Sequence, residues 1–159
     1  MFFINYYFTV IPMRHLLPPH LFLLSLIALA LPWAVSPERP ALPVGNIVLS
    51  VASLVLGVGW LAWARMHFLR KDAEIMTFGD PRALVEDGPF RFSRNPMYLG
   101  FLLILVSAAF LLNNWLAILP PLVFWLASAF WYIPFEERAL RDAFGPAYDD
   151  YAHKTRRWI

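Results

Sequence analysis

The chain has 159 residues, of which 60% are hydrophobic and 17% aromatic, and its mean hydropathy is +0.56. This composition is too apolar for an ordinary soluble domain and indicates a single membrane-embedded domain. The 13 basic and 11 acidic residues leave a formal net charge of +2, which gives no indication of a nucleic-acid partner. The absence of cysteine excludes disulfides, thiolate metal sites and a cysteine nucleophile, and the four histidines lack metal-binding spacing.

We expect residues 1–15 to form an N-terminal extension and residues 16–159 to form the single domain. The extension is apolar and aromatic, but it is too short to cross a bilayer and lacks the flanks of a signal peptide. Both Met1 and Met13 are compatible with the start of translation. Residues 1–12 are then either an upstream extension or an interfacial anchor.

Four apolar stretches predict an all-α integral membrane protein with four transmembrane helices, at about 16–35, 46–64, 96–112 and 115–135. Each is near the length of about 20 residues that a helix needs to cross a bilayer. Pro18 is expected near the start of the first helix, and Asn46 is a candidate cap for the second. Gly57 and Gly59 permit close contact between helices.

Turn signals divide the second half of the chain. The pair Asn113–Asn114 predicts a tight reversal, and Pro120–Pro121 predicts either a kink in the fourth helix or the place where it begins. After residue 135 the chain becomes amphipathic, which predicts a cytoplasmic C-terminal helix over 136–155. The dipeptide Gly145–Pro146 should break this helix into two pieces.

The distribution of basic residues predicts the orientation. Six of the 13 lie within 65–95 and five follow residue 135, whereas the segment 36–45 carries one and the Asn113–Asn114 turn none. The positive-inside rule therefore places both large polar segments and both termini in the cytoplasm. Because the third and fourth helices are antiparallel and of similar length, their Asn95 and Glu136 ends are then expected to lie close together and to form one pocket. The short, cysteine-free chain further suggests a bacterial inner-membrane protein.

The start of the third helix has the features of an anion site. Asn95 is a favourable N-cap and Pro96 suits the first helical position, so the unpaired N–H groups of the helix face Arg91 and Arg94. A helix N-terminus flanked by cations can bind an anion. The simpler alternative is a capped helix start whose arginines meet lipid headgroups.

Two blocks of sequence carry a resemblance. The first is Gly-Pro-Phe at 88–90 followed by Ser-Arg-Asn-Pro-Met-Tyr-Leu-Gly at 93–100, and the second runs from Glu136–Glu137 to Tyr151. They resemble the Arg-His-Pro-x-Tyr signature and the C-terminal Glu-Glu motif of the isoprenylcysteine carboxyl methyltransferase family. That superfamily also contains membrane phospholipid N-methyltransferases. Asn95 stands where the family usually has histidine.

The resemblance implies an S-adenosylmethionine-dependent methyltransferase without a metal, acting on a lipophilic membrane substrate by carboxyl O- or amine N-methylation. Its implied cofactor-binding residues are Leu84, Val85, Phe90, Arg94, Asn95, Pro96, Met97, Tyr98 and Glu137. Among these, Arg94 at the helix N-terminus suits the cofactor's carboxylate, and Glu137 suits the ribose hydroxyls. Glu136 is the implied catalytic residue, because it can take a proton from an amine substrate.

Other interpretations remain open at this point. NADPH-dependent sterol and steroid reductases have a similar signature, but Met97 replaces their asparagine and the helix after Tyr98 contains no acidic residue. A non-enzymatic membrane protein is the third class. The simpler alternative for Glu136–Glu137 is that the pair only marks the end of a span. In every class, the basic, aromatic tail formed by Arg156, Arg157 and Trp158 is most simply an anchor to lipid headgroups. The resemblance implies that eukaryotic family members use charged residues just before the glutamate pair to handle a prenylcysteine carboxylate. Here residues 131–135 are apolar, which argues against a prenylcysteine substrate.

Overall fold

The computed structural model describes residues 17–35, 41–70 and 83–159. Among these residues every regular element is a helix, and none is a strand. The all-α prediction is therefore confirmed for the described part of the chain. The N-terminal extension expected at 1–15 and much of the polar segment after the second helix, at 71–82, lie outside the described residues.

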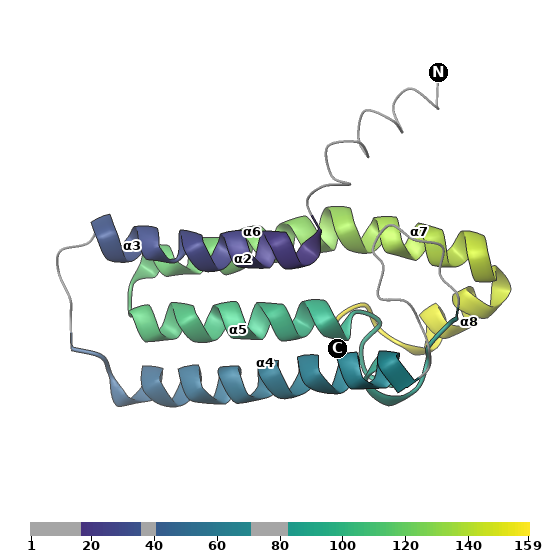
Figure 1. The fold of residues 1–159 in the computed structure, drawn as a ribbon, viewed down its shortest axis with the longest axis horizontal. Helices are drawn as coiled ribbons and strands as arrows, with labels where there is room; N and C mark the ends of the chain where they lie inside the picture. The colour runs from purple at the N-terminus through teal and green to yellow at the C-terminus, as the bar shows by residue number, and fades with distance from the viewer. Residues whose placement is uncertain (1–16, 36–40, 71–82) are drawn as a thin grey trace, which may run out of the picture.

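Helices α2 (Pro18–Ala28), α4 (Val44–Arg70), α5 (Pro96–Leu112) and α6 (Leu119–Ala127) run side by side along one axis (Figure 1). The remaining helices are the short α3 (Ala30–Val35), which follows α2, and α7 (Ile133–Phe144) and α8 (Pro146–Lys154), which lie at the end of the bundle where α5 begins. Two short 3₁₀ turns, η1 (Gly88–Arg91) and η2 (Trp115–Ile118), and one π-helical turn, η3 (Ser128–Tyr132), complete the order. Helix α5 packs on α4 along one side and on α2 and α6 along the other.

Within the described residues, two helices are long and apolar enough to cross a membrane, namely α4 and the continuous run Trp115–Phe144. The apolar helices Pro18–Pro32 and Pro96–Leu112 are shorter. The second helix was expected to end near residue 64, but it continues to Arg70. Nothing between residues 65 and 70 breaks a helix, and this last stretch provides side chains against which the next loop packs.

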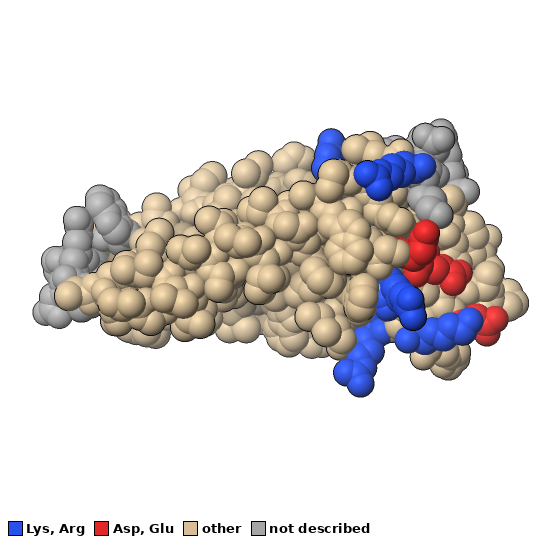
Figure 2. All heavy atoms as spheres, turned by 90° about the horizontal axis from the view of Figure 1, so that it is seen from below, with Lys and Arg blue, Asp and Glu red and all other residues tan. Residues whose placement is uncertain are grey.

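In the part of the chain that the structure describes, charge is confined to one end. In the described chain every Asp, Glu, Lys and Arg lies within 65–70, 83–95 or 136–159, and none lies in the helical regions between. Figure 2 shows these side chains gathered at one end, with a long uncharged body beside them. Burying a charge in an apolar medium is costly, so this segregation is what a bilayer imposes on a spanning bundle.

Helices α4 and α5 approach closely through small residues. A Cβ on Gly57 would lie 2.9 Å from the Gly100 carbonyl oxygen, and the buried hydroxyls of Ser50 and Ser107 are 3.1 Å apart. The prediction of close contact is thus confirmed at Gly57. It is wrong at Gly59, where an added Cβ meets nothing within 4 Å, because this residue lies on the exposed side of α4.

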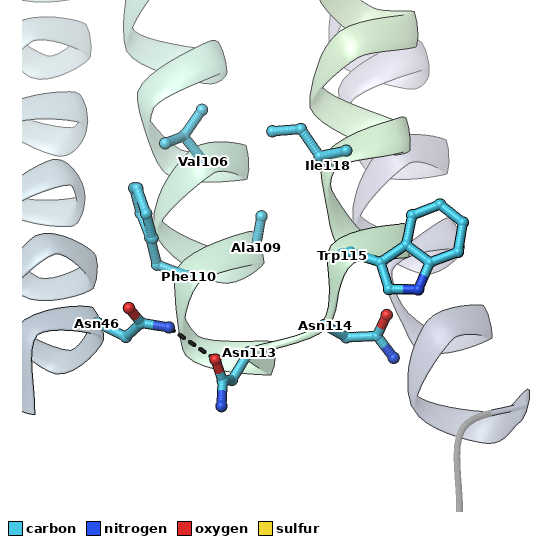
Figure 3. Close-up of a pocket in the computed structure, with 8 residues that line it drawn as sticks. All are labelled: Asn46, Val106, Ala109, Phe110, Asn113, Asn114, Trp115 and Ile118. Carbon is cyan, nitrogen blue, oxygen red and sulfur yellow. Dashed lines mark hydrogen bonds between the residues drawn. The ribbon is translucent and has the colours of Figure 1, made fainter. Parts of the chain in front are cut away.

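The turn between α5 and α6 lies at the end of the bundle opposite the charged side chains of the described residues, and Figure 3 shows it in close-up. Asn113 adopts a left-handed conformation with φ of 48°, which confirms the predicted reversal. Its Oδ1 accepts a 2.9 Å hydrogen bond from Asn46 Nδ2. Asn46 lies inside α4 and tethers this turn, so its predicted role as a helix cap is wrong. Above the turn is a cavity of about 270 Å³ lined by Asn46, Val106, Ala109, Phe110, Asn113, Asn114, Trp115 and Ile118.

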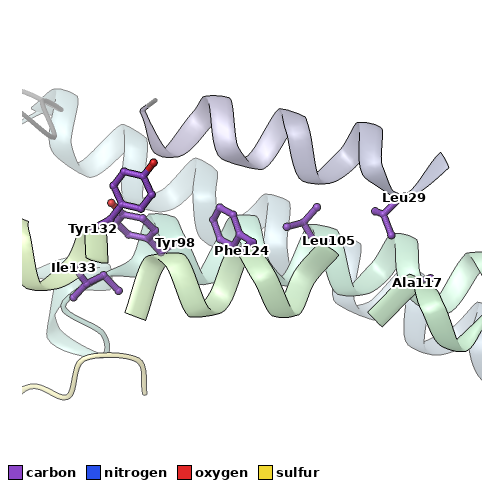
Figure 4. Close-up of a cluster of buried hydrophobic side chains, with 7 residues drawn as sticks. All are labelled: Leu29, Tyr98, Leu105, Ala117, Phe124, Tyr132 and Ile133. Carbon is purple, nitrogen blue, oxygen red and sulfur yellow. The ribbon is translucent and has the colours of Figure 1, made fainter. Parts of the chain in front are cut away.

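A core of buried side chains runs between the helices (Figure 4), formed by Leu29, Tyr98, Leu105, Ala117, Phe124, Tyr132 and Ile133. The Phe124 ring lies 6.2 Å from Phe101 and 6.4 Å from Phe22, both in edge-on geometry, and it ties α6 to α5 and α2. Pro120 and Pro121 occupy the first turn of α6, so they mark a helix start and not a kink.

The contact between α4 and α5 yields a matched pair of substitutions. We expect Gly57→Ala to lower the free energy of unfolding by about 1–3 kcal/mol, because its methyl group overlaps a backbone oxygen. Gly59→Ala should be neutral or stabilising, since alanine favours the helix and space is open. Thermal unfolding in detergent, followed by circular dichroism, measures both. Equal stability of the two variants would contradict the close contact.

Candidate active site at the charged end

The polar loop before α5 is fixed to the end of α4. His67 Nε2 lies 2.8 Å from Asp87 Oδ1, and the Phe90 ring packs edge-on against Phe68 with 4.8 Å between centroids. Gly88 has φ of +62°, and a Cβ there would lie 2.8 Å from the His67 ring. Both the backbone conformation and the space at position 88 therefore require glycine.

Helix α8 closes over this loop. Tyr151 donates a 2.7 Å hydrogen bond to the Phe90 carbonyl oxygen, and Tyr148 and Tyr151 pack with Val85 and Phe90 in a second buried cluster. Burial raises the pKa of both tyrosines, so both stay protonated at neutral pH. Val85 and Phe90, two of the implied cofactor-binding residues, are buried in this cluster, and Leu84 packs against it.

Helix α5 begins at Pro96, as predicted, and Asn95 occupies the N-cap position. The Asn95 side chain does not cap the helix, so that part of the prediction is wrong. Its backbone (φ −129°, ψ 55°) is not in the extended conformation from which a cap side chain reaches the first turn. Its amide Nδ2 instead donates a 3.0 Å hydrogen bond to the carbonyl oxygen of Arg157, near the C-terminus.

Glu137 receives two guanidinium groups. Arg157 reaches it through Nε at 3.0 Å and Nη2 at 2.5 Å, a bidentate pair, and Arg94 Nη2 lies 3.2 Å from Oε1. The side chains of Glu137 and Arg94 are 11% and 14% exposed. The sequence predicts a headgroup anchor at Arg157, whereas the structure places its side chain beside Glu137. No sequence signal predicts this contact, because a basic residue near a chain terminus shows the same pattern whether it pairs with a carboxylate or with lipid headgroups.

Glu136 has a different neighbour. Tyr98 donates a 2.9 Å hydrogen bond to its Oε1, and the Tyr98 ring belongs to the core between the helices. The two adjacent glutamates of α7 thus each contact a residue of the 94–98 stretch. Pro96 is buried and Met97 half-buried in that stretch. The expected convergence of the two motifs is observed.

The arrangement is suited to hold an anion. Two arginines share one carboxylate, and one of them, Arg94, comes two residues before the first residue of α5. Arg94 Nε is buried and has no hydrogen-bond partner among the described residues, so it can still donate. The same part of the chain contains no group of three side chains that could ligate a metal. The 270 Å³ cavity is at the opposite end of the bundle and belongs to no part of this site.

Comparison with known proteins gives the family. The family model described as phospholipid methyltransferase matches residues 46–147, which is more than half of the chain. This chain belongs to the phospholipid methyltransferase family. Two rice proteins, from Oryza sativa subspecies indica and japonica, are each described as a probable protein-S-isoprenylcysteine O-methyltransferase and are 30% identical to it over 113 residues. No solved structure matches the chain.

The match to the phospholipid methyltransferase family includes α4 to α7 with both glutamates, and it ends before Arg157. The aligned region covers 70% of this chain and 53% of each rice protein, so the chain spans about half the length of these relatives. Family membership favours a methyltransferase over the reductase alternative. The relatives are plant proteins, and the bacterial inner membrane stays a prediction.

The unexpected role of Asn95 gives a test. An aspartate N-cap is as good as asparagine, but Asn95→Asp removes the Nδ2 donor and places a carboxylate against the Arg157 carbonyl oxygen. We expect a loss of about 1–3 kcal/mol in the free energy of unfolding, and a smaller loss for Asn95→Ala. Chemical unfolding in detergent measures both. An aspartate variant as stable as the unaltered protein would instead indicate a capping side chain.

Proposed function

We propose that this chain is an S-adenosylmethionine-dependent methyltransferase that modifies a lipophilic substrate at the membrane surface. The observation that carries the proposal is the pairing of the two family-like motifs at the charged end of an uncharged helix bundle. There Tyr98 contacts Glu136 and Arg94 contacts Glu137. A site with charged walls beside an apolar body is suited to join a polar cofactor and a lipid.

The residues present fit the cofactor's chemistry. Its carboxylate requires cationic donors, which Arg94 offers through a buried Nε without a partner in the described chain, next to the α5 N-terminus. Its ribose hydroxyls require acceptors, and Glu137 is the nearest carboxylate to that arginine. Half-buried Leu84 and Met97 would offer apolar surface to the adenine. Val85 and Phe90, buried in the cluster against which Leu84 packs, would support Leu84.

S-adenosylmethionine supplies an electrophilic methyl group on a positively charged sulfur. Holding a nucleophile in line with such a group can contribute about 7–11 kcal/mol without an acid or base. Glu136, oriented by the Tyr98 hydroxyl, is the residue that accepts a proton when the nucleophile is an amine. A carboxylate substrate is already ionised at neutral pH and requires no base.

The substrate is proposed to reach the site from the bilayer. Helix α4 exposes large apolar side chains along most of its length, and the body between the charged segments contains no ionised residue in the described chain. We propose that all four apolar segments span the membrane and that the charged end faces the cytoplasm. We propose a lipid amine or acid as the substrate in preference to a prenylcysteine, because residues 131–135, just before the glutamate pair, are apolar.

Activity and its proton acceptor can be tested together. Purified protein with labelled S-adenosylmethionine and a membrane lipid extract should yield a labelled lipid. Glu136→Gln should lower kcat at least tenfold for an amine substrate, with donor affinity nearly unchanged, and should have little effect for a carboxylate substrate. Asp142→Asn, an exposed change on the same helix, is the matched control. Binding of NADPH with no binding of S-adenosylmethionine would refute the proposal.

Orientation is a separate expectation. A reporter fused after Ile159 and one inserted near Asp80 should both report the cytoplasm, and one at Pro40 should report the opposite side. The reason is that the basic residues are concentrated in two segments, 65–95 and the part of the chain after residue 135. Reporters at Ile159 and Asp80 on different sides would be incompatible with one shared site.

A further inference from the structure

The carboxylate of Glu137 has little acceptor capacity left. A carboxylate offers about four lone-pair positions. Oε1 faces Arg157 Nε and Arg94 Nη2, and Oε2 faces Arg157 Nη2, so three of these are directed at guanidinium groups. A ribose diol brings two hydroxyl donors. Glu137 therefore has room for one of them, and the second requires that a guanidinium leaves.

The two arginines differ in how easily they can leave. The Arg94 side chain is 14% exposed, and this residue directly precedes the N-cap of α5, whereas the Arg157 side chain is 40% exposed. A cation near solvent regains water when its pair breaks, and a buried cation does not. Arg157 is thus the exchangeable partner and Arg94 the resident one.

The backbone around Arg157 is independently held. Asn95 Nδ2 and Ser93 Oγ donate to the Arg157 carbonyl oxygen at 3.0 and 3.4 Å, and the Arg94 N–H donates to the Arg156 carbonyl oxygen at 3.0 Å. Trp158 packs against the central core. The guanidinium of Arg157 can consequently turn away by side-chain rotation while the C-terminal segment stays in place.

We propose that Arg157 is a positioning residue that holds Glu137 in the ligand-free site and releases it when a nucleoside ligand binds. This inference rests on the proposed function, because it takes the ribose hydroxyls of the methyl donor as the incoming group. The Arg157 side chain then competes with the ligand for one carboxylate, which lowers ligand affinity and keeps Glu137 oriented between turnovers.

Calorimetric titration with S-adenosylhomocysteine tests the competition. Arg157→Ala should bind it about two- to fivefold more tightly than the unaltered chain, the range expected when a partly exposed ion pair no longer has to break. Arg156→Ala is the matched control, because it removes the same charge from an exposed neighbour whose backbone carbonyl oxygen, which the substitution leaves in place, accepts the hydrogen bond from Arg94. It should bind as the unaltered chain does. Equal or weaker binding by Arg157→Ala would overturn the inference.

A second measurement uses the unaltered chain and does not depend on folding of a variant. Modification of Arg157 by phenylglyoxal, followed by peptide mass spectrometry, should become faster when S-adenosylhomocysteine is added. Slower or unchanged modification would overturn the inference while leaving the proposed function standing. If the unaltered chain does not bind S-adenosylhomocysteine at all, the proposed function and this inference fall together.

Discussion

The shared carboxylate of Glu137 is the interaction on which the charged end depends. It joins three parts of the chain that are distant in sequence: the start of α5 through Arg94, helix α7, and the C-terminal segment through Arg157. Without this carboxylate two guanidinium groups would face each other in a partly buried place, which is costly. The acid therefore holds the site together in addition to any contact with a ligand.

The rest of the fold brings that carboxylate to the right place. Helices α4 and α5 are held at short range by Gly57 and Gly100, and the loop before α5 is fixed to α4 by the His67–Asp87 pair. The close packing of α4 on α5 and the attachment of the loop to α4 limit the positions that Arg94 and Glu137 can take. Such preorganisation is what a site that works by alignment requires.

Hydropathy predicted the helical body because runs of uncharged residues dictate where a chain can cross a bilayer. It also predicted that the Asn95 and Glu136 ends would meet, since two antiparallel helices of similar length finish level. Contacts between side chains could not be predicted from the sequence in the same way. Asn46 and Asn95 occur where helix caps are expected, yet each forms a hydrogen bond to a residue more than 60 positions away. The local sequence carries no information on such distant partners. Arg157 was missed for the same reason.

The π-helical turn Ser128–Tyr132 has a consequence for how this chain can vary. It carries an extra residue within a run that is otherwise continuous from α6 to α7, and the buried Ser128 hydroxyl bonds to the Phe124 carbonyl oxygen at its start. Each residue of an α-helix turns the chain by about 100°. If one residue were lost here, Glu136 and Glu137 would rotate away from Tyr98 and Arg94, although every hydrophobic span would remain intact. A single insertion or deletion in this segment would therefore disrupt the site. The hydrophobicity of the segment alone would not reveal this constraint, because an apolar insertion or deletion leaves the span apolar.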